Sequence, residues 1–182
     1  MPILLSLWLV GFEPAAVLPA TFAVTPAGEV VAVSGGRGVF AFAAGGKLRW
    51  RFAVMEGQTV LGAPGVAPGG TVFVRTDREL YAITNVGSLY WRRSLPSPAL
   101  DPDWLRPVPL AGREVVVITG ARELTGFSPT GDVLWRYSVP GDDPLSARPE
   151  TAANGNIYVR TAREVVVLTP SGREAWRTTI VQ

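Results

Sequence analysis

The sequence predicts an all-β protein, a β-propeller built of four-stranded antiparallel blades. Tryptophans recur along the 182 residues at a nearly constant stride, and the apolar segments are short and rich in β-branched and aromatic residues. In addition, 20 glycines and 16 prolines are spread over the whole chain, which is typical of many turns between short strands. A helical solenoid would need a 3.6-residue periodicity that this sequence lacks.

Four tryptophans define the repeat, with separations of 41, 44 and 41 residues. A glycine stands four residues before each of them, an arginine directly after, and another arginine thirteen residues before. We expect the register to hold without gaps for more than twenty residues upstream. The tryptophans are Trp50, Trp91, Trp135 and Trp176; the glycines Gly46, Gly87, Gly131 and Gly172; the following arginines Arg51, Arg92, Arg136 and Arg177; and the preceding arginines Arg37, Arg78, Arg122 and Arg163.

Each repeat contains three strands joined by short turns, and a fourth, less regular strand is expected in the proline-containing stretch before them. Glycine in the turns permits the positive φ that a tight hairpin requires. Residues 21–182 therefore form one four-repeat domain, with repeats at about 21–54, 58–96, 105–140 and 146–181. The regular strands are expected at 30–34, 38–42 and 47–52; 71–75, 79–83 and 88–95; 115–119, 123–127 and 132–139; and 157–161, 164–168 and 174–180.

The recurring residues are predicted to join the blades. An indole in the outer strand can lie across the next blade and bury roughly 200 Å², which links sheets that cannot bury their faces alone. The glycine opens the turn into that strand. Arginines near Glu79, Glu123 and Glu164 are expected to form a solvated, ion-paired rim. We therefore assign structural docking roles to Trp50, Trp91, Trp135 and Trp176 and to Gly46, Gly87, Gly131 and Gly172.

At these residues the chain resembles the pyrroloquinoline-quinone-like (PQQ-like) β-propeller repeat family, whose outer strand reads like "lyALdpdGklkWky". The matching segments here are ELYAITNVGSLYWRRSL, ELTGFSPTGDVLWRYSV and EVVVLTPSGREAWRTTI. The resemblance covers residues from about 20 to 180. It implies the fold and the tryptophan docking feature. Members of the family include quinoprotein alcohol and glucose dehydrogenases, a lipoprotein scaffold of bacterial outer-membrane protein assembly, and ligand-sensing ectodomains.

The chain departs from the enzymatic branch of that family. The threonine that usually precedes the docking glycine is present only as Thr130, with Gly45, Val86 and Ser171 in the other repeats. Cysteine is absent, so the adjacent cysteine pair that covers the quinone in many of those enzymes cannot form. Nothing matches their calcium-ligating Glu, Asn and Asp set. The resemblance therefore implies the non-enzymatic branch, with no cofactor.

The N-terminal residues 1–20 form an apolar segment that admits three interpretations: an extra outer strand, an uncleaved signal, or the cut end of a longer parent. Trp8 lies 42 residues before Trp50, although Leu4 and Leu9 replace the glycine and arginine of the repeat. The apolar run is too short to span a membrane. Four blades are an open half-ring, a small closed propeller, or part of a larger one. In the first case two chains can pair into an eight-bladed ring.

Composition excludes several chemistries. Without Cys and His there is no thiolate, no Ser-His-Asp triad and no imidazole-bound zinc. The net charge of +2 is interspersed, so no nucleic-acid partner is expected. Loop carboxylates offer too few oxygens for a calcium site, and we predict no metal. Those carboxylates are Asp101, Asp103, Asp142 and Asp143. Trp104 lies outside the repeat register and is either an interface anchor, like Trp8, or packed under its own loop.

The leading functional hypothesis is a non-catalytic binding or scaffolding propeller that contacts a protein partner, or another copy, through open blade edges. It is not expected to be an enzyme, and an extracytoplasmic location, in the periplasm or at the cell surface, is favoured. The alternatives are a fragment of a quinone-dependent dehydrogenase or a ligand-sensing ectodomain of a membrane protein. Fold class does not decide among these functions.

Overall fold

The computed structural model describes residues 21–25, 27–96 and 98–180. Within these residues the chain forms sixteen β-strands and one short 3₁₀ helix, η1 (Pro102–Leu105). The strands make four separate sheets of four strands, and the order in each sheet follows the sequence. All pairings are antiparallel, so every sheet is a simple meander. The predicted all-β fold with four-stranded antiparallel blades is confirmed.

Each sheet, numbered here as blades 1 to 4 in chain order, falls within one of the predicted repeats. Its first strand is short, and its last strand carries the recurring tryptophan. Blade 1 contains β1 (Thr21–Val24), β2 (Val30–Ser34), β3 (Gly38–Phe42) and β4 (Leu48–Ala53); blade 2, β5 (Gly65–Val66), β6 (Val72–Arg75), β7 (Glu79–Ile83) and β8 (Leu89–Ser94); blade 3, β9 (Val108–Pro109), β10 (Val115–Ile118), β11 (Glu123–Phe127) and β12 (Val133–Ser138); and blade 4, β13 (Glu150–Thr151), β14 (Ile157–Arg160), β15 (Glu164–Leu168) and β16 (Glu174–Thr179).

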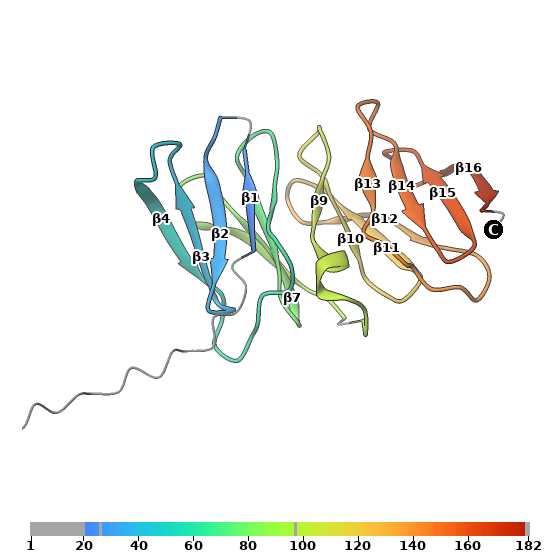
Figure 1. Ribbon diagram of the computed structural model, residues 1–182, viewed down its shortest axis with the longest axis horizontal. Coiled ribbons are helices and arrows are strands. Elements are labelled where there is room, and N and C mark those ends of the chain that lie inside the picture. Colours follow the sequence, from blue (N-terminus) through green and yellow to red (C-terminus); the bar gives the residue numbers. More distant parts are fainter. Residues whose placement is uncertain (1–20, 26, 97, 181–182) are drawn as a thin grey trace, which may run out of the picture.

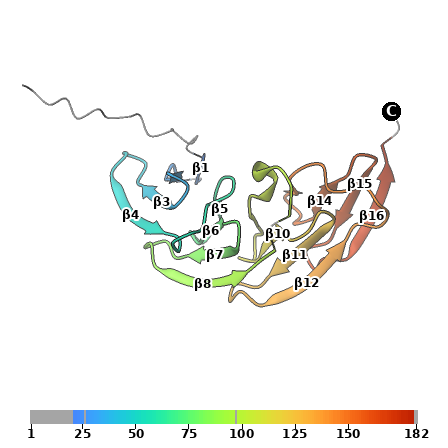
Figure 2. The same ribbon diagram turned by 90° about the horizontal axis from the view of Figure 1, so that it is seen from below.

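The four blades stand side by side along an arc (Figure 1). Figure 2 shows the last strands β4, β8, β12 and β16 along the convex side, with the first strands of the blades on the concave side. The first strands of neighbouring blades are in contact, β1 with β5 and β5 with β9. Blades 1 and 4 lie at opposite ends of the arc, so the alternative of a small closed four-bladed propeller is wrong for this chain.

The hydrophobic cores lie between blades because each strand sends alternate side chains to opposite faces of its sheet. In blade 1 the row Ala23, Val31, Ala41 and Trp50 is paired across the four strands and faces blade 2. Three such clusters fill the three junctions of the described arc. Stacking blades therefore builds one continuous series of cores, as in other repeat proteins.

The expected gapless register upstream of the tryptophans is wrong by one residue. Val33 pairs with Val39 in blade 1, whereas Arg75 pairs with Leu80 in blade 2, so the hairpin is one residue longer in blade 1. Blade 3 has the longer hairpin as well, and blade 4 the shorter one. Blades 1 and 3 thus form one type and blades 2 and 4 another. The structurally equivalent residues at the end of the second strand are Val33, Arg75, Ile118 and Arg160.

Candidate binding surfaces

Three of the four recurring indoles, those of Trp50, Trp91 and Trp135, lie between successive blades. Trp91 Nε1 on β8 donates a hydrogen bond to the carbonyl oxygen of Pro129 in blade 3, at 2.7 Å. The same bond runs from Trp50 to Asn85 at 3.0 Å and from Trp135 to Pro170 at 3.1 Å. Each acceptor stands two residues before the recurring glycine of the next blade. Each of these three indoles therefore makes a hydrogen bond to the next blade, a geometry that is compatible with the predicted docking role.

The glycines are required by two constraints, one of which was not foreseen in the sequence. All four have positive φ, between 75° and 84°, as a tight turn requires. A Cβ added to Gly87 would meet Trp50 at 2.7 Å, and one added to Gly131 would meet Trp91 at 2.7 Å. The indole of Trp135 likewise occupies the space above Gly172. Glycine therefore gives the preceding blade's indole room to lie flat on the turn.

The two ends of the arc lack this contact within the described residues. Nothing lies within 4 Å of a Cβ built on Gly46, the recurring glycine of blade 1. Trp176 in blade 4 is 48% exposed, whereas Trp91 is 7% exposed. Trp8, named from the sequence as a possible interface residue, lies outside the described residues.

The predicted arginine and glutamate pairs lie along the blades with a different pairing than expected. The hairpin glutamates Glu79 and Glu123 pair with Arg92 and Arg136, the arginines that follow the tryptophans, at 3.8 and 3.7 Å. Both arginine side chains are about half exposed, so each pair contributes roughly 0–1 kcal/mol. The hairpin arginines pair with aspartates instead: Arg78 with Asp77, Arg122 with Asp142 and Arg163 with Asp143.

Arg75 is a buried residue that the sequence reasoning missed. It ends β6, and its guanidinium donates to the carbonyl oxygens of Ile118 in blade 3, at 2.7 Å, and of Pro96, at 2.6 Å. Its side chain is fully buried, and burial lowers its pKa to about 10. The sequence signal for such a buried residue is an arginine at the end of an otherwise apolar strand. Arg160 is the matching residue of blade 4.

A hydrogen-bonded cluster closes the junction between blades 1 and 2. Glu79 accepts hydrogen bonds from Gln58 Nε2 at 2.6 Å and from Tyr81 OH at 2.7 Å. The Gln58 bond lowers the pKa of Glu79 most, against burial, which raises it, and the Tyr81 bond lowers it further. Burial and the nearby Glu79 raise the pKa of Tyr81. The cluster is saturated by its own members, which favours a structural role.

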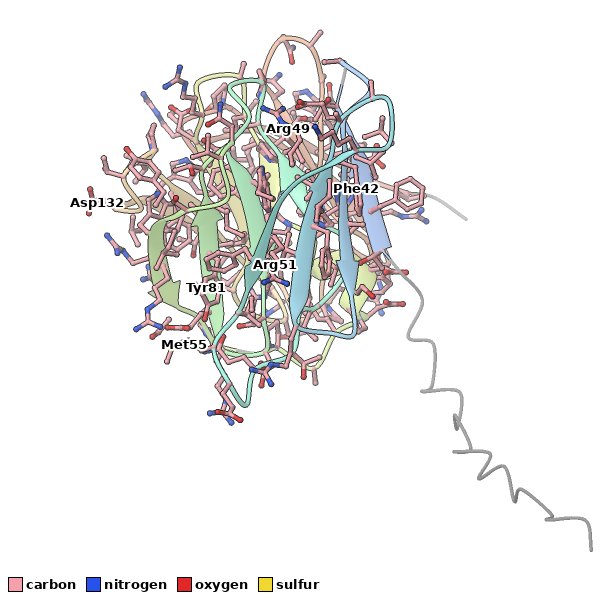
Figure 3. All side chains as sticks on the ribbon, turned by 90° about the vertical axis from the view of Figure 1, so that its left-hand side faces the viewer. Phe42, Arg49, Arg51, Met55, Tyr81 and Asp132 are labelled. Carbon is pink, nitrogen blue, oxygen red and sulfur yellow. The ribbon has the colours of Figure 1, made fainter. Side chains whose placement is uncertain are left out.

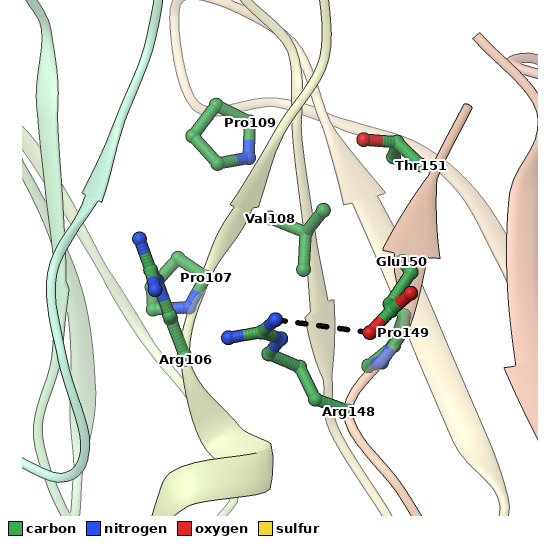
Figure 4. Close-up of a pocket in the computed structure, with 8 residues that line it drawn as sticks. All are labelled: Arg106, Pro107, Val108, Pro109, Arg148, Pro149, Glu150 and Thr151. Carbon is green, nitrogen blue, oxygen red and sulfur yellow. Dashed lines mark ion pairs between the residues drawn. The ribbon is translucent and has the colours of Figure 1, made fainter. Parts of the chain in front are cut away.

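A cleft of about 370 Å³ opens between the first strands of blades 3 and 4. Arg106 and Arg148 line it, and Arg148 pairs with Glu150 at 3.9 Å (Figure 4). Burial lowers the pKa of Arg106, and the positive charge of Arg148 lowers it further. Within the described residues Arg106 makes no ion pair. Two crowded guanidiniums with one carboxylate form a site that favours an incoming anion.

The acidic residues singled out in the sequence are engaged elsewhere. Asp101 caps η1 by accepting from the backbone N–H of Asp103, at 2.9 Å. Asp142 and Asp143 pair with arginines of neighbouring hairpins. Among the residues with described positions, no three His, Cys, Asp or Glu side chains gather as a metal site would require. Trp104 in η1 is partly buried against the cluster that contains Leu105 and Leu110.

No helix in residues 21–25, 27–96 and 98–180 combines the length and the apolar character needed to cross a bilayer. This finding concerns the described part of the chain alone.

Solved structures similar to this chain are β-propellers. BamB from Moraxella catarrhalis aligns with a TM-score of 0.66 at 19% identity, over 87% of this chain and 47% of that one. Virginiamycin B lyase from Staphylococcus aureus aligns at 0.67 with 15% identity, over 90% and 56%. The Neurospora crassa Pan2 WD40 domain aligns at 0.63 with 15% identity, over 88% and 49%. At these identities the likeness shows the fold alone, and the chain spans about half the length of these proteins.

A search of the curated proteins finds no match in sequence. A family model described as outer membrane protein assembly factor BamB matches residues 6–142 and 39–182, which together take in nearly the whole chain. This match confirms the resemblance drawn from the Gly-x-x-x-Trp-Arg repeats. The chain therefore belongs to the PQQ-like β-propeller repeat family represented by that assembly factor.

Proposed function

We propose that this chain is a non-catalytic binding or scaffolding propeller that contacts a protein partner in an extracytoplasmic compartment. The observation that carries the proposal is the cleft lined by Arg106 and Arg148, which presents hydrogen-bond donors. Guanidinium groups donate and do not accept, so they bind carboxylates well and are poor proton acceptors. The family description, outer membrane protein assembly factor, supports both the scaffolding role and the location.

The chemistry of the cleft specifies the kind of group that it binds. An acidic side chain of a partner can bridge the two guanidiniums bidentately and replace the repulsion between them with two charge-assisted hydrogen bonds. A bound anion also offsets the positive charge of Arg148 that lies near Arg106. The partner surface is therefore proposed to be an acidic peptide segment.

The binding proposal is tested with a hexaglutamate peptide, titrated into the chain by calorimetry at low salt. We expect saturable binding that weakens as salt rises and that is lost in the Arg106→Gln, Arg148→Gln double variant. Arg173→Gln is the matched control, because it removes an equal charge from the exposed turn before β16. Equal binding by the double variant and the parent would rule out the cleft as the binding site.

The non-catalytic part is tested separately by incubation with pyrroloquinoline quinone and calcium. We expect no stoichiometric chromophore in the visible absorption spectrum and no dye-linked oxidation of alcohols or glucose. A bound quinone with turnover would favour the dehydrogenase alternative instead. Fractionation of the source cells, followed with an antibody to the chain, tests the extracytoplasmic location.

A further inference from the structure

Each junction of the arc joins two different surfaces. We call the face that carries the tryptophan and contacts the following blade the leading face. The face that carries the recurring glycine and contacts the preceding blade is the receiving face. Three leading faces meet three receiving faces within the described chain. The receiving face of blade 1 and the leading face of blade 4 have no neighbour among the described residues (Figures 1 and 2).

The receiving face of blade 1 is apolar at the positions that are buried in blade 2. Its row Val24, Val30, Phe42 and Leu48 corresponds to the row of blade 2 that contains the buried Val72 and Ile83. Phe22 and Val24 are each 58% exposed and Leu48 is 47% exposed. Figure 3 looks onto blade 1 from this end of the arc and labels Phe42 and Arg51. This surface has the composition of an interior junction without the blade that would cover it.

The leading face of blade 4 has the complementary features. Trp176 shares a cross-strand row with Val167 and Tyr158, as Trp91 does with Ala82 and Phe73 in blade 2. Tyr158 and Trp176 make an edge-to-face contact with ring centroids 6.5 Å apart. Their aromatic surface is therefore already ordered, which reduces the entropy lost when a blade covers it.

A buried arginine adds a polar contact to one interior junction, the one between blades 2 and 3. Arg75 of blade 2 donates to the carbonyl oxygen of Ile118, its structural equivalent in blade 3. The residue of blade 4 equivalent to Arg75 is Arg160, which is exposed. The residue of blade 1 equivalent to Ile118 is Val33. A blade 1 packed on blade 4 would thus offer Arg160 the carbonyl oxygen of Val33.

We propose that the leading face of blade 4 packs on the receiving face of blade 1 from a second copy of the chain, and that two such junctions close two copies into an eight-bladed ring. Trp176 lies on Gly46 of the other copy and donates to the carbonyl oxygen of Ala44, two residues before that glycine. Arg160 donates to the carbonyl oxygen of Val33. Each junction joins two unlike faces, and a two-fold axis relates the two junctions, so that no face is left free.

A second copy is the occupant that continues the interface already present in the chain. It supplies a complete blade with indole, acceptor and apolar rows in the geometry of the three interior junctions. It also preserves the alternation of hairpin lengths, because blade 4 has the shorter hairpin and blade 1 the longer. The proposal is independent of the acidic partner, since Arg106 and Arg148 line a different cleft.

The first experiment is light scattering of the 182-residue chain over a wide concentration series. We expect a mass twice the 19.4 kDa of one chain, without growth beyond it. A mass that stays at that of one chain, or that rises without limit as in a filament, would overturn the closed pair.

Complementary variants then identify which faces meet. Trp176→Glu alters the leading face and Phe22→Glu the receiving face, and each is expected to raise the dimer dissociation constant roughly thirtyfold or more. Both residues are exposed in the single chain, so neither change should unfold it. An equimolar mixture of the two variants contains one intact junction in each mixed pair and should recover dimer that neither variant forms alone. A pairing of like faces would leave one of the variants fully dimeric and would refute the head-to-tail contact.

Two further variants complete the test. Tyr90→Glu removes a similarly exposed aromatic residue from β8, away from the terminal faces, and should leave the pair intact. Trp8→Ala is expected to leave the mass unchanged. If the parent is monomeric and Trp8→Ala forms dimers, the N-terminal segment covers the receiving face and a second copy does not.

Discussion

Trp91 and Trp176 stand at the same position of the same outer strand in two blades, yet they are in opposite environments. Trp91 lies between Phe73 and Phe127, with ring centroids 5.9 and 6.3 Å away, and is 7% exposed. Trp176 has one aromatic neighbour, from its own blade, and is 48% exposed. The same residue is therefore core in one blade and surface in the other. A repeated motif specifies what a side chain can contact, and the neighbouring blade determines whether the contact exists.

The largest difference in the free energy of unfolding between the two blades is expected at the tryptophans themselves. At concentrations where the chain is monomeric, Trp91→Ala should lower the free energy of unfolding by about 3–5 kcal/mol, because it opens a cavity in the junction between blades 2 and 3. Trp176→Ala should change it by about 0.5–1 kcal/mol, as expected for an exposed residue. Urea unfolding followed by circular dichroism measures both. Equal losses would mean that Trp176 is already covered within a single chain.

The equivalent arginines of blades 2 and 4, Arg75 and Arg160, should show the second largest difference in the free energy of unfolding. Arg75→Ala removes a buried guanidinium and leaves the carbonyl oxygens of Ile118 and Pro96 without their donor. We expect a loss of roughly 2–4 kcal/mol from unpaired acceptors and lost packing. Arg160→Ala, at the equivalent position of blade 4, should stay within about 0.5 kcal/mol in the monomer. Thermal unfolding of the two variants under identical conditions provides the measurement, and a costly Arg160→Ala in the monomer would contradict it.

The recurring glycines separate the backbone effect from the packing effect. Gly46→Ala meets no atom within 4 Å and carries only the left-handed conformation, at φ +80°, which costs about 1–2 kcal/mol for alanine. Gly131→Ala carries the same backbone cost and also drives its Cβ into the indole of Trp91, so its total should be roughly 2–5 kcal/mol. The shift of the denaturant midpoint, at an unchanged slope of unfolding free energy against denaturant concentration, measures the difference in cost between the two variants. An identical cost at both positions would show that the indole yields without strain.

The smallest predicted effect concerns acid stability at the cluster between blades 1 and 2. Hydrogen bonds from Gln58 and Tyr81 lower the pKa of Glu79 in the folded state. Its contribution is therefore present above the unfolded-state pKa and is lost as the pH falls through the lowered folded-state value. Glu79→Gln should make the acid branch of the unfolding free energy shallower against pH. Asp142→Asn, which removes a fully exposed loop carboxylate, is the matched control. A steeper acid branch in Glu79→Gln would contradict the direction.

Much of the architecture could be predicted from the sequence. The alternation of residues within a strand and the repeat from blade to blade are both visible in the residue types. The expected strands at 38–42 and 79–83 coincide with β3 and β7, since alternating β-branched and aromatic residues pack on both faces of an inner strand. The short first strands were located only approximately. With two ladder pairs each in β5 and β9, they have little pattern of their own, and their place is fixed by the blades around them.

The sites were less accessible than the fold. Arg106 and Arg148 are about forty residues apart and meet only because two loops enter neighbouring blades at the same end. Arg75 is of a residue type expected at the solvated rim, yet it is buried like a core residue. The residue type alone does not reveal this burial. The docking roles assigned to the tryptophans and glycines remain predictions of function, and the variants above measure them. The residues that meet between two blades depend on the hairpin lengths. The one-residue difference between the hairpins of blades 1 and 2 was not predicted from the sequence.

That one-residue difference has a consequence for how such chains grow. Blades 2 and 4 share the shorter hairpin and the sequence Arg-Thr-x-Arg-Glu, whereas blades 1 and 3 share the longer hairpin and an aliphatic residue in place of the first arginine. The repeating structural unit of the described arc is accordingly a pair of unlike blades. Gain or loss of one blade would set two of the same kind next to each other and mismatch their polar partners, so lineages built on this unit should change blade number in even steps.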